Sequence, residues 1–109
     1  MLYTDTVGVV FLKKGGEKTN KVYMITYDLD SPGQRYDGLI EAIKESSNGV
    51  YCSYWKSSFL IQSGKSAKEI MESLVPFLDQ NDRIIVIEVV KHYHGRLDSD
   101  AWEYIHAML

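Results

Sequence analysis

Acidic, hydroxyl and basic side chains stand at the ends of several apolar segments of this 109-residue sequence. Asp28 lies near the end of the segment Val22–Leu29, and Asp30 follows that segment. The other members of this group are Lys56, Ser57, Ser58, Asp82 and Arg83. Carboxylate, hydroxyl and basic groups gathered in one place could bind or act on a polar ligand. Whether these groups can act together depends on the elements that carry them.

The apolar patterns predict six elements in the order β-α-β-β-α-β, followed by a C-terminal helix. Val22–Leu29 is rich in β-branched and aromatic residues, which predicts a strand. Ser31, Pro32 and Gln34 form a capping box that begins a helix, and Gly49 ends it. The remaining predicted elements are strands at Val50–Trp55 and Ser58–Gln62, a helix from Ser66 whose apolar stripe reaches Leu78, a strand at Ile84–Val90 and a helix from Asp100.

This order predicts an α+β fold of the ferredoxin-like βαββαβ type. Right-handed crossovers give an antiparallel sheet with strand order four, one, three, two and both helices on one face. The C-terminal helix is additional. In such a sheet Asp28, the Lys56–Ser58 turn and Arg83 lie at one end, and Glu88 lies at the other.

The last predicted strand carries aliphatic residues on both faces. The sheet face away from the helices is therefore apolar, and a large apolar surface is rarely left in water. Either the C-terminal helix or a second copy of the chain must cover it. We favour a homodimer.

Residues 1–20 form an N-terminal extension to a single domain of residues 21–109. They end in a polar, glycine-containing stretch, Lys13–Asn20. Two interpretations stay open. The extension is a translated leader with the natural start near Val22, or its segment Thr6–Leu12 is an extra strand that pairs with a sheet edge.

Composition narrows the class of protein. Twelve basic and fifteen acidic residues give a net charge of −3, which argues against a histone-like or strand-coating nucleic-acid binder but not against a small nuclease. The single cysteine, Cys52, excludes an intrachain disulfide and a cysteine-based zinc cage. No apolar run is long enough to cross a membrane, so we expect a cytoplasmic protein.

Two further groups, one of histidines and one of aromatic residues, give weaker indications of a binding site. His92, His94 and His106 match no known metal-ligand spacing, so we expect them to face solvent or an interface. Tyr51, Tyr54 and Trp55 have the chemistry to stack on bases, although cross-strand pairing or a dimer contact is the more common use.

The strand Tyr23–Leu29, the capped helix that follows it and the segment Ser57–Ile61 resemble the small ferredoxin-fold proteins of the CRISPR adaptation complex and the related VapD toxins. They are most similar to small bacterial and phage proteins of the SinR family. The resemblance covers about residues 22–90.

The resemblance implies a homodimeric cytoplasmic protein. In active relatives the carboxylate that ends the first strand comes from both subunits and holds Mg²⁺ for phosphodiester hydrolysis, and Asp28 matches that position. Relatives also carry several basic residues early in the first helix, which are reduced here to Arg35.

Two functions therefore follow as expectations. The first is a homodimer that processes nucleic acid, as a low-activity Mg²⁺-dependent endoribonuclease or other endonuclease, with Asp28 catalytic and Arg35, Lys56, Ser57 and Ser58 binding RNA or DNA. The second is a non-catalytic phage or mobile-element module whose dimer surface binds a host protein or small ligand.

Overall fold

The computed structural model describes residues 20–30 and 32–109, with the side chains of Pro32–Arg35 left aside. The predicted extension at residues 1–20 lies outside this part of the chain, apart from Asn20. The elements are β1 (Lys21–Asp28), α1 (Pro32–Ser46), β2 (Tyr51–Cys52), β3 (Ser58–Ser63), α2 (Ala67–Leu74), the 3₁₀ turn η2 (Val75–Phe77), β4 (Arg83–Val89) and α3 (Ser99–Met108).

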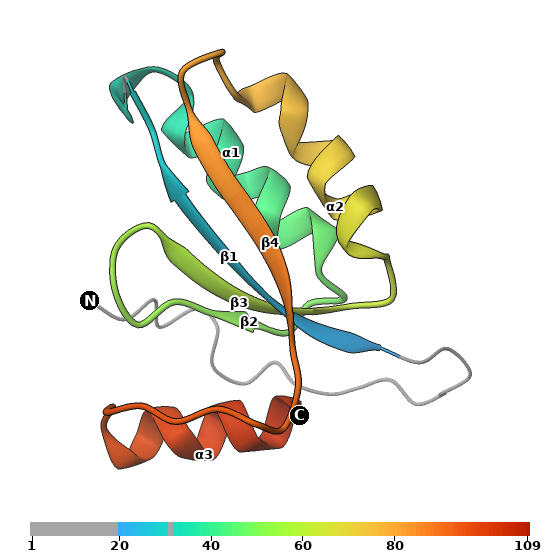
Figure 1. Cartoon of the computed structure of the whole chain (residues 1–109), viewed down its shortest axis with the longest axis vertical. Helices are drawn as coiled ribbons and strands as arrows, with labels where there is room; N and C mark the ends of the chain where they lie inside the picture. The colour runs from blue at the N-terminus through green and yellow to red at the C-terminus, as the bar shows by residue number, and fades with distance from the viewer. Residues whose placement is uncertain (1–19, 31) are drawn as a thin grey trace.

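The four strands form one antiparallel sheet in the order β2-β3-β1-β4. This is the order four, one, three, two read from the opposite edge. Helices α1 and α2 lie together on one face of the sheet. Helix α3 lies apart from them, beyond the C-terminal end of β4 (Figure 1). The chain is therefore an α+β protein with a four-stranded antiparallel sheet and three α-helices.

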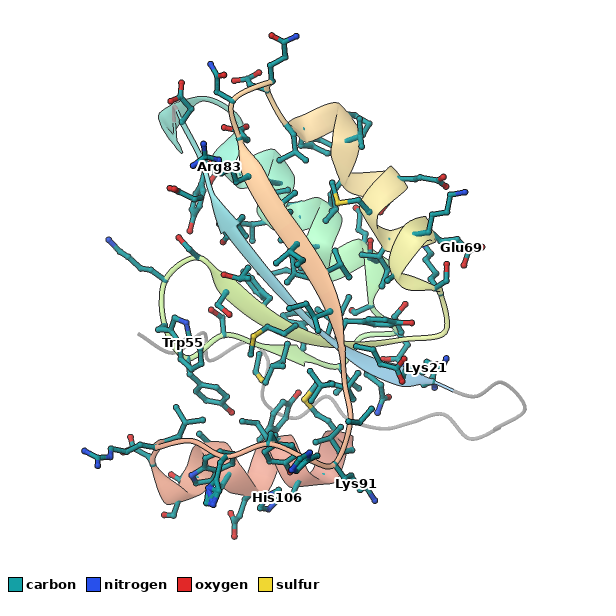
Figure 2. The ribbon with its side chains drawn as sticks, in the orientation of Figure 1. Lys21, Trp55, Glu69, Arg83, Lys91 and His106 are labelled. Atoms are coloured by element: carbon teal, nitrogen blue, oxygen red, sulfur yellow. The ribbon has the colours of Figure 1, made fainter. Side chains whose placement is uncertain are left out.

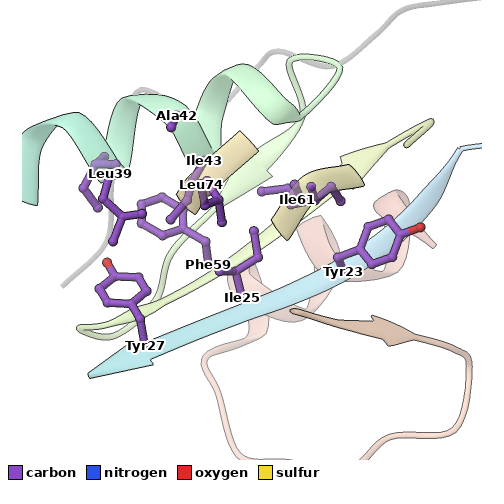
Figure 3. Close-up of a cluster of buried hydrophobic side chains, with 11 residues drawn as sticks. Tyr23, Ile25, Tyr27, Leu39, Ala42, Ile43, Phe59, Ile61 and Leu74 are labelled. Carbon is purple, nitrogen blue, oxygen red and sulfur yellow. The ribbon is translucent and has the colours of Figure 1, made fainter. Parts of the chain in front are cut away.

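Alternation along β1 builds the main core. Tyr23, Ile25 and Tyr27 point toward α1 and α2 and are buried, as the sequence predicts. Figure 3 shows them packed with Phe59 and Ile61 of β3 and with apolar side chains of the helices. The fully buried members contributed by the helices are Leu39, Ile43, Ile70 and Leu74.

The opposite face of the sheet is only partly covered. Val22, Cys52 and Met108 form a second buried cluster, in which α3 closes over β2 and the start of β1. Further along the same face, Ile85 and Ile87 of β4 stay 52% and 45% exposed. Helix α3 thus covers one end of this face, and no other element of residues 20–30 and 32–109 covers the other end.

Two elements are shorter than predicted. The strand expected at residues 50–55 is paired only at Tyr51–Cys52, because the hydroxyl of Ser53 donates to the backbone oxygens of Trp55 and Ser58 and so replaces the strand pairing. Helix α2 ends at Leu74 rather than near Leu78. Pro76 has no amide hydrogen to continue the helix, and the chain tightens into η2.

In the described part of the chain, no helix combines the length and the apolar character that crossing a membrane requires.

Close packing of α1 against η2 depends on Gly38. A Cβ atom added there would lie 2.8 Å from Cδ1 of Phe77. Alanine normally stabilises a helix interior by about 1 kcal/mol relative to glycine. We expect Gly38→Ala instead to lower the free energy of unfolding by about 1–2 kcal/mol in urea denaturation, because the ring must move.

The double variant Gly38→Ala/Phe77→Leu is the control, since a smaller side chain removes the overlap. In the Phe77→Leu background, Gly38→Ala should lower the free energy of unfolding by less than in the wild type, or should raise it. An equal penalty in both backgrounds would show that the ring is not its cause.

Candidate functional site

A polar cavity of about 440 Å³ lies at the end of the sheet where β1 finishes and β4 begins. Asp28 and Arg83 are partners in the antiparallel register, so their side chains leave the sheet on the same face. Figure 2 shows Arg83 at this end of the molecule, far from α3. The residues that line the cavity are Asp28, Leu29, Asp30, Gln80, Asn81, Asp82 and Arg83.

Asp82 holds the two loops of the cavity together. Its Oδ1 accepts a hydrogen bond from the backbone N–H of Asp30 at 2.7 Å, and its Oδ2 accepts one from the N–H of Asp79 at 2.7 Å. Both carboxylate oxygens thus bind backbone donors. Asp82 fixes the geometry of the cavity, and Asp28 is the exposed carboxylate on the sheet itself.

The loop between β2 and β3 lies beside this end of β1. The N–H of Tyr27 donates to the backbone oxygen of Ser57 at 3.1 Å, which brings the loop next to Asp28. Ser57 has a φ of 64° and is half-buried, and Lys56 is exposed. Ser58 is buried and opposes Thr26 in the sheet, so its hydroxyl does not face solvent.

The group predicted at one end of the sheet is therefore brought together, but its members differ in access. Asp28, Asp30 and Arg83 are exposed around the cavity. Glu88 lies at the other end, as predicted, with an oxygen 3.9 Å from Nζ of Lys21. Arg35 falls in the first turns of α1, and its side chain lies outside the described residues.

Within residues 20–30 and 32–109, no group of three or more His, Cys, Asp or Glu side chains could hold a metal ion. His92, His94 and His106 are exposed and form no such group. Among the described residues Asp28 thus belongs to no such group of three, and a metal held there would need additional oxygen ligands from substrate, water or a second copy.

Cys52 is a buried packing residue. Its side chain is fully buried, and this burial raises the pKa of the thiol to about 12. Burial likewise raises the pKa of Tyr104 to about 12, although its hydroxyl donates to the backbone oxygen of Tyr51 at 3.2 Å. A neutral, enclosed thiol is not a nucleophile.

Three residues of the cavity, Gln80, Asn81 and Arg83, have no role assigned by sequence reasoning. The pattern placed Arg83 at this end of the sheet but gave no reason to prefer it over other basic residues. Its position as the first residue of the strand that pairs with β1 is the signal that distinguishes it.

No protein-family model matches this chain, and no curated protein matches it.

The double role of Asp82 gives a stability prediction. Asp82→Ala removes the acceptor of two charge-assisted hydrogen bonds to backbone donors, and we expect it to lower the free energy of unfolding by about 1–2 kcal/mol. Chemical denaturation measures this. Asp37→Ala, an exposed carboxylate on α1, should change stability by less than about 0.5 kcal/mol. Equal effects of the two substitutions would contradict the assigned role.

Proposed function

We propose that this protein is a cytoplasmic homodimer that processes nucleic acid, with Asp28 of each copy at a Mg²⁺-dependent phosphodiesterase site. One observation carries the proposal: Asp28 is an exposed carboxylate at the rim of an exposed apolar sheet face. The strand order β2-β3-β1-β4 and the placement of α1 and α2 on one face of the sheet also support a ferredoxin-like arrangement. They support in the same way the likeness to the CRISPR-adaptation and VapD proteins.

The open face supplies the reason for a second copy. Met24 and Ile87 oppose one another in the register, as do Thr26 and Ile85, so they share the face that carries Asp28. Fully burying an isoleucine contributes about 1.5–3 kcal/mol, and Ile85 and Ile87, each about half exposed, would each gain roughly half of that. A two-fold axis close to Asp28 would bring the two carboxylates together, because a symmetric interface joins each residue near the axis to its own copy.

The donor chemistry fits Mg²⁺ in that arrangement. This ion prefers carboxylate oxygens, keeps several waters and is commonly held by only one or two carboxylates together with substrate phosphate. When bound, it would polarise the phosphate and favour ionisation of water. The chain itself would hold the ion through Asp28, while Asp82 keeps the surrounding loops in place.

Basic groups beside Asp28 would bind the substrate. Arg83 lies directly across the register from Asp28, and Lys56 is exposed on the adjoining loop. We propose both as phosphate ligands, with Arg35 on α1 as a third. Ser57 is half-buried and Ser58 is buried, so of these two serines Ser57 is the one accessible to a substrate.

A second candidate function is a non-catalytic module that binds a host protein or small ligand through the dimer surface. The net charge of −3 favours it, since an acidic surface repels nucleic acid. The lack, among the described residues, of a group of three or more metal-ligating side chains at Asp28 favours it too. Cleavage measurements separate the two candidates.

The catalytic proposal predicts Mg²⁺-dependent cleavage of RNA or DNA that depends on Asp28. We expect Asp28→Ala and Asp28→Asn to reduce the cleavage rate at least 100-fold, because the metal loses its protein ligand. The measurement is gel-resolved cleavage of labelled strands with Mg²⁺ or with EDTA. Asp37→Ala is the matched control and should cleave at the wild-type rate.

Absence of cleavage by the wild-type protein, or equal cleavage by the Asp28 variants, would overturn catalysis and leave the interaction module. Circular dichroism of each variant keeps a folding defect from being read as lost chemistry.

The dimer is tested separately through its apolar face. Ile87→Lys places a charge on the proposed interface and should convert a dimer to a monomer in light scattering after size exclusion. Val75 is 55% exposed on η2, on the helical side of the sheet, so Val75→Lys should leave the mass unchanged. A wild-type monomer, or a dimer that survives Ile87→Lys, would contradict this interface.

A further inference from the structure

An aromatic stack lies at the end of the molecule opposite Asp28. Tyr93, Trp102 and His106 lie within about 6 Å of one another, since the three centroid distances are 6.0 Å for Tyr93–Trp102, 5.8 Å for Trp102–His106 and 6.1 Å for Tyr93–His106. Their planes differ by 10°, 25° and 35° respectively, so Trp102 stacks on both of the other rings while Tyr93 and His106 are tilted relative to each other.

The stack is not part of the apolar core beneath α3. That helix buries Ala101, Ile105 and Met108, of which Met108 packs with Val22 and Cys52 of the sheet. Trp102 and His106 are the neighbours of these residues in sequence and occupy an adjacent face, four residues apart. Tyr93 is 36% exposed and His106 is exposed, so the fold does not use the outer parts of these rings.

A cavity of about 430 Å³ opens beside the stack. It is lined by Lys91, Tyr93, His106 and Leu109. Figure 2 shows Lys91 and His106 together at the α3 end of the molecule. Two flat rings, one apolar side chain and one ammonium group thus line an open space of the size that small ligands occupy in proteins.

These groups match the parts of a nucleotide. A base stacks on an aromatic ring whatever its identity, because every base has a π-face, and lysine binds phosphate as a point charge. The side-chain carboxylates nearest in sequence to the cavity residues are Glu88, three residues before Lys91, and Glu103, three residues before His106, and neither lines the cavity.

We propose that this cavity binds one nucleotide unit of single-stranded nucleic acid, with the base against Tyr93 and His106 and the phosphate at Lys91. The proposal rests on the nucleic-acid function given above and adds a second contact for the strand, at the opposite end of the sheet from Asp28. The same chemistry would accept a free mononucleotide, and the experiment distinguishes the two.

The chain provides a reporter for this site. It has two tryptophans, Trp55 and Trp102, and Trp55 is 47% exposed in the β2–β3 loop. In a Trp55→Phe background Trp102 is the single tryptophan. A single-stranded RNA of about 12 nucleotides, titrated in EDTA, should quench its fluorescence. Polarisation of a labelled copy of the RNA gives the affinity independently.

Variants test the two halves of the site. Base stacking contributes about 1–3 kcal/mol, so Tyr93→Ala should weaken binding at least about 5-fold, while Tyr93→Phe keeps the ring and should stay within about 2-fold of the parent. Lys91→Ala should weaken binding. It should also reduce by about 0.7 the steepness with which the logarithm of the binding constant falls with the logarithm of salt concentration, because one phosphate contact is lost. Lys68→Ala removes an exposed lysine on α2 and should do neither.

Adenosine monophosphate is the second probe. If it binds as tightly as the RNA, the ligand is the free nucleotide rather than a strand. If neither probe quenches Trp102, or if Tyr93→Ala binds RNA as tightly as Tyr93→Phe, the proposal is overturned. Because binding is measured in EDTA and repeated with Asp28→Ala, loss of cleavage and loss of this site are separate results.

Discussion

The alternation of side chains along β1 is the constraint on which the rest of the structure depends. Tyr23, Ile25 and Tyr27 must point to the helical face to complete the main core. The intervening residues, which end at Asp28, are therefore committed to the opposite face. A shift of one residue in register would bury this carboxylate beneath α1 and expose the core, so packing and the candidate site are fixed by the same pairing.

The opposite face is divided between two uses. At one end α3 buries Val22 and Cys52, and at the other the isoleucines of β4 remain exposed beside the polar cavity. This division explains why a chain with a complete main core still presents an apolar surface. It also separates the molecule into a carboxylate end and an aromatic end, with the sheet between them.

The two ends differ in how they are built. Around Asp28 the geometry comes from backbone hydrogen bonds to Asp82, which fix loops but leave open space in the cavity. Around Tyr93 the geometry comes from ring stacking on Trp102, which in turn stacks on His106. The first arrangement suits ion and phosphate binding, and the second suits a flat ring.

Local rules are strong enough to determine most of the fold from sequence. Strand alternation, the capping box at Ser66 and the polar turns predict the elements and their order, because these signals act between residues close in the chain. The early end of α2 at Leu74 and the short β2 were missed, since hydrogen bonds of Ser53 and the missing amide hydrogen of Pro76 outweigh the apolar pattern there.

Tertiary structure alone decided which members of the polar group are accessible, because it buries Ser58 and exposes Arg83. It alone stacked Tyr93 on Trp102 of a helix that begins six residues later. Exposure and ring contact depend on packing between distant segments, which no local spacing encodes.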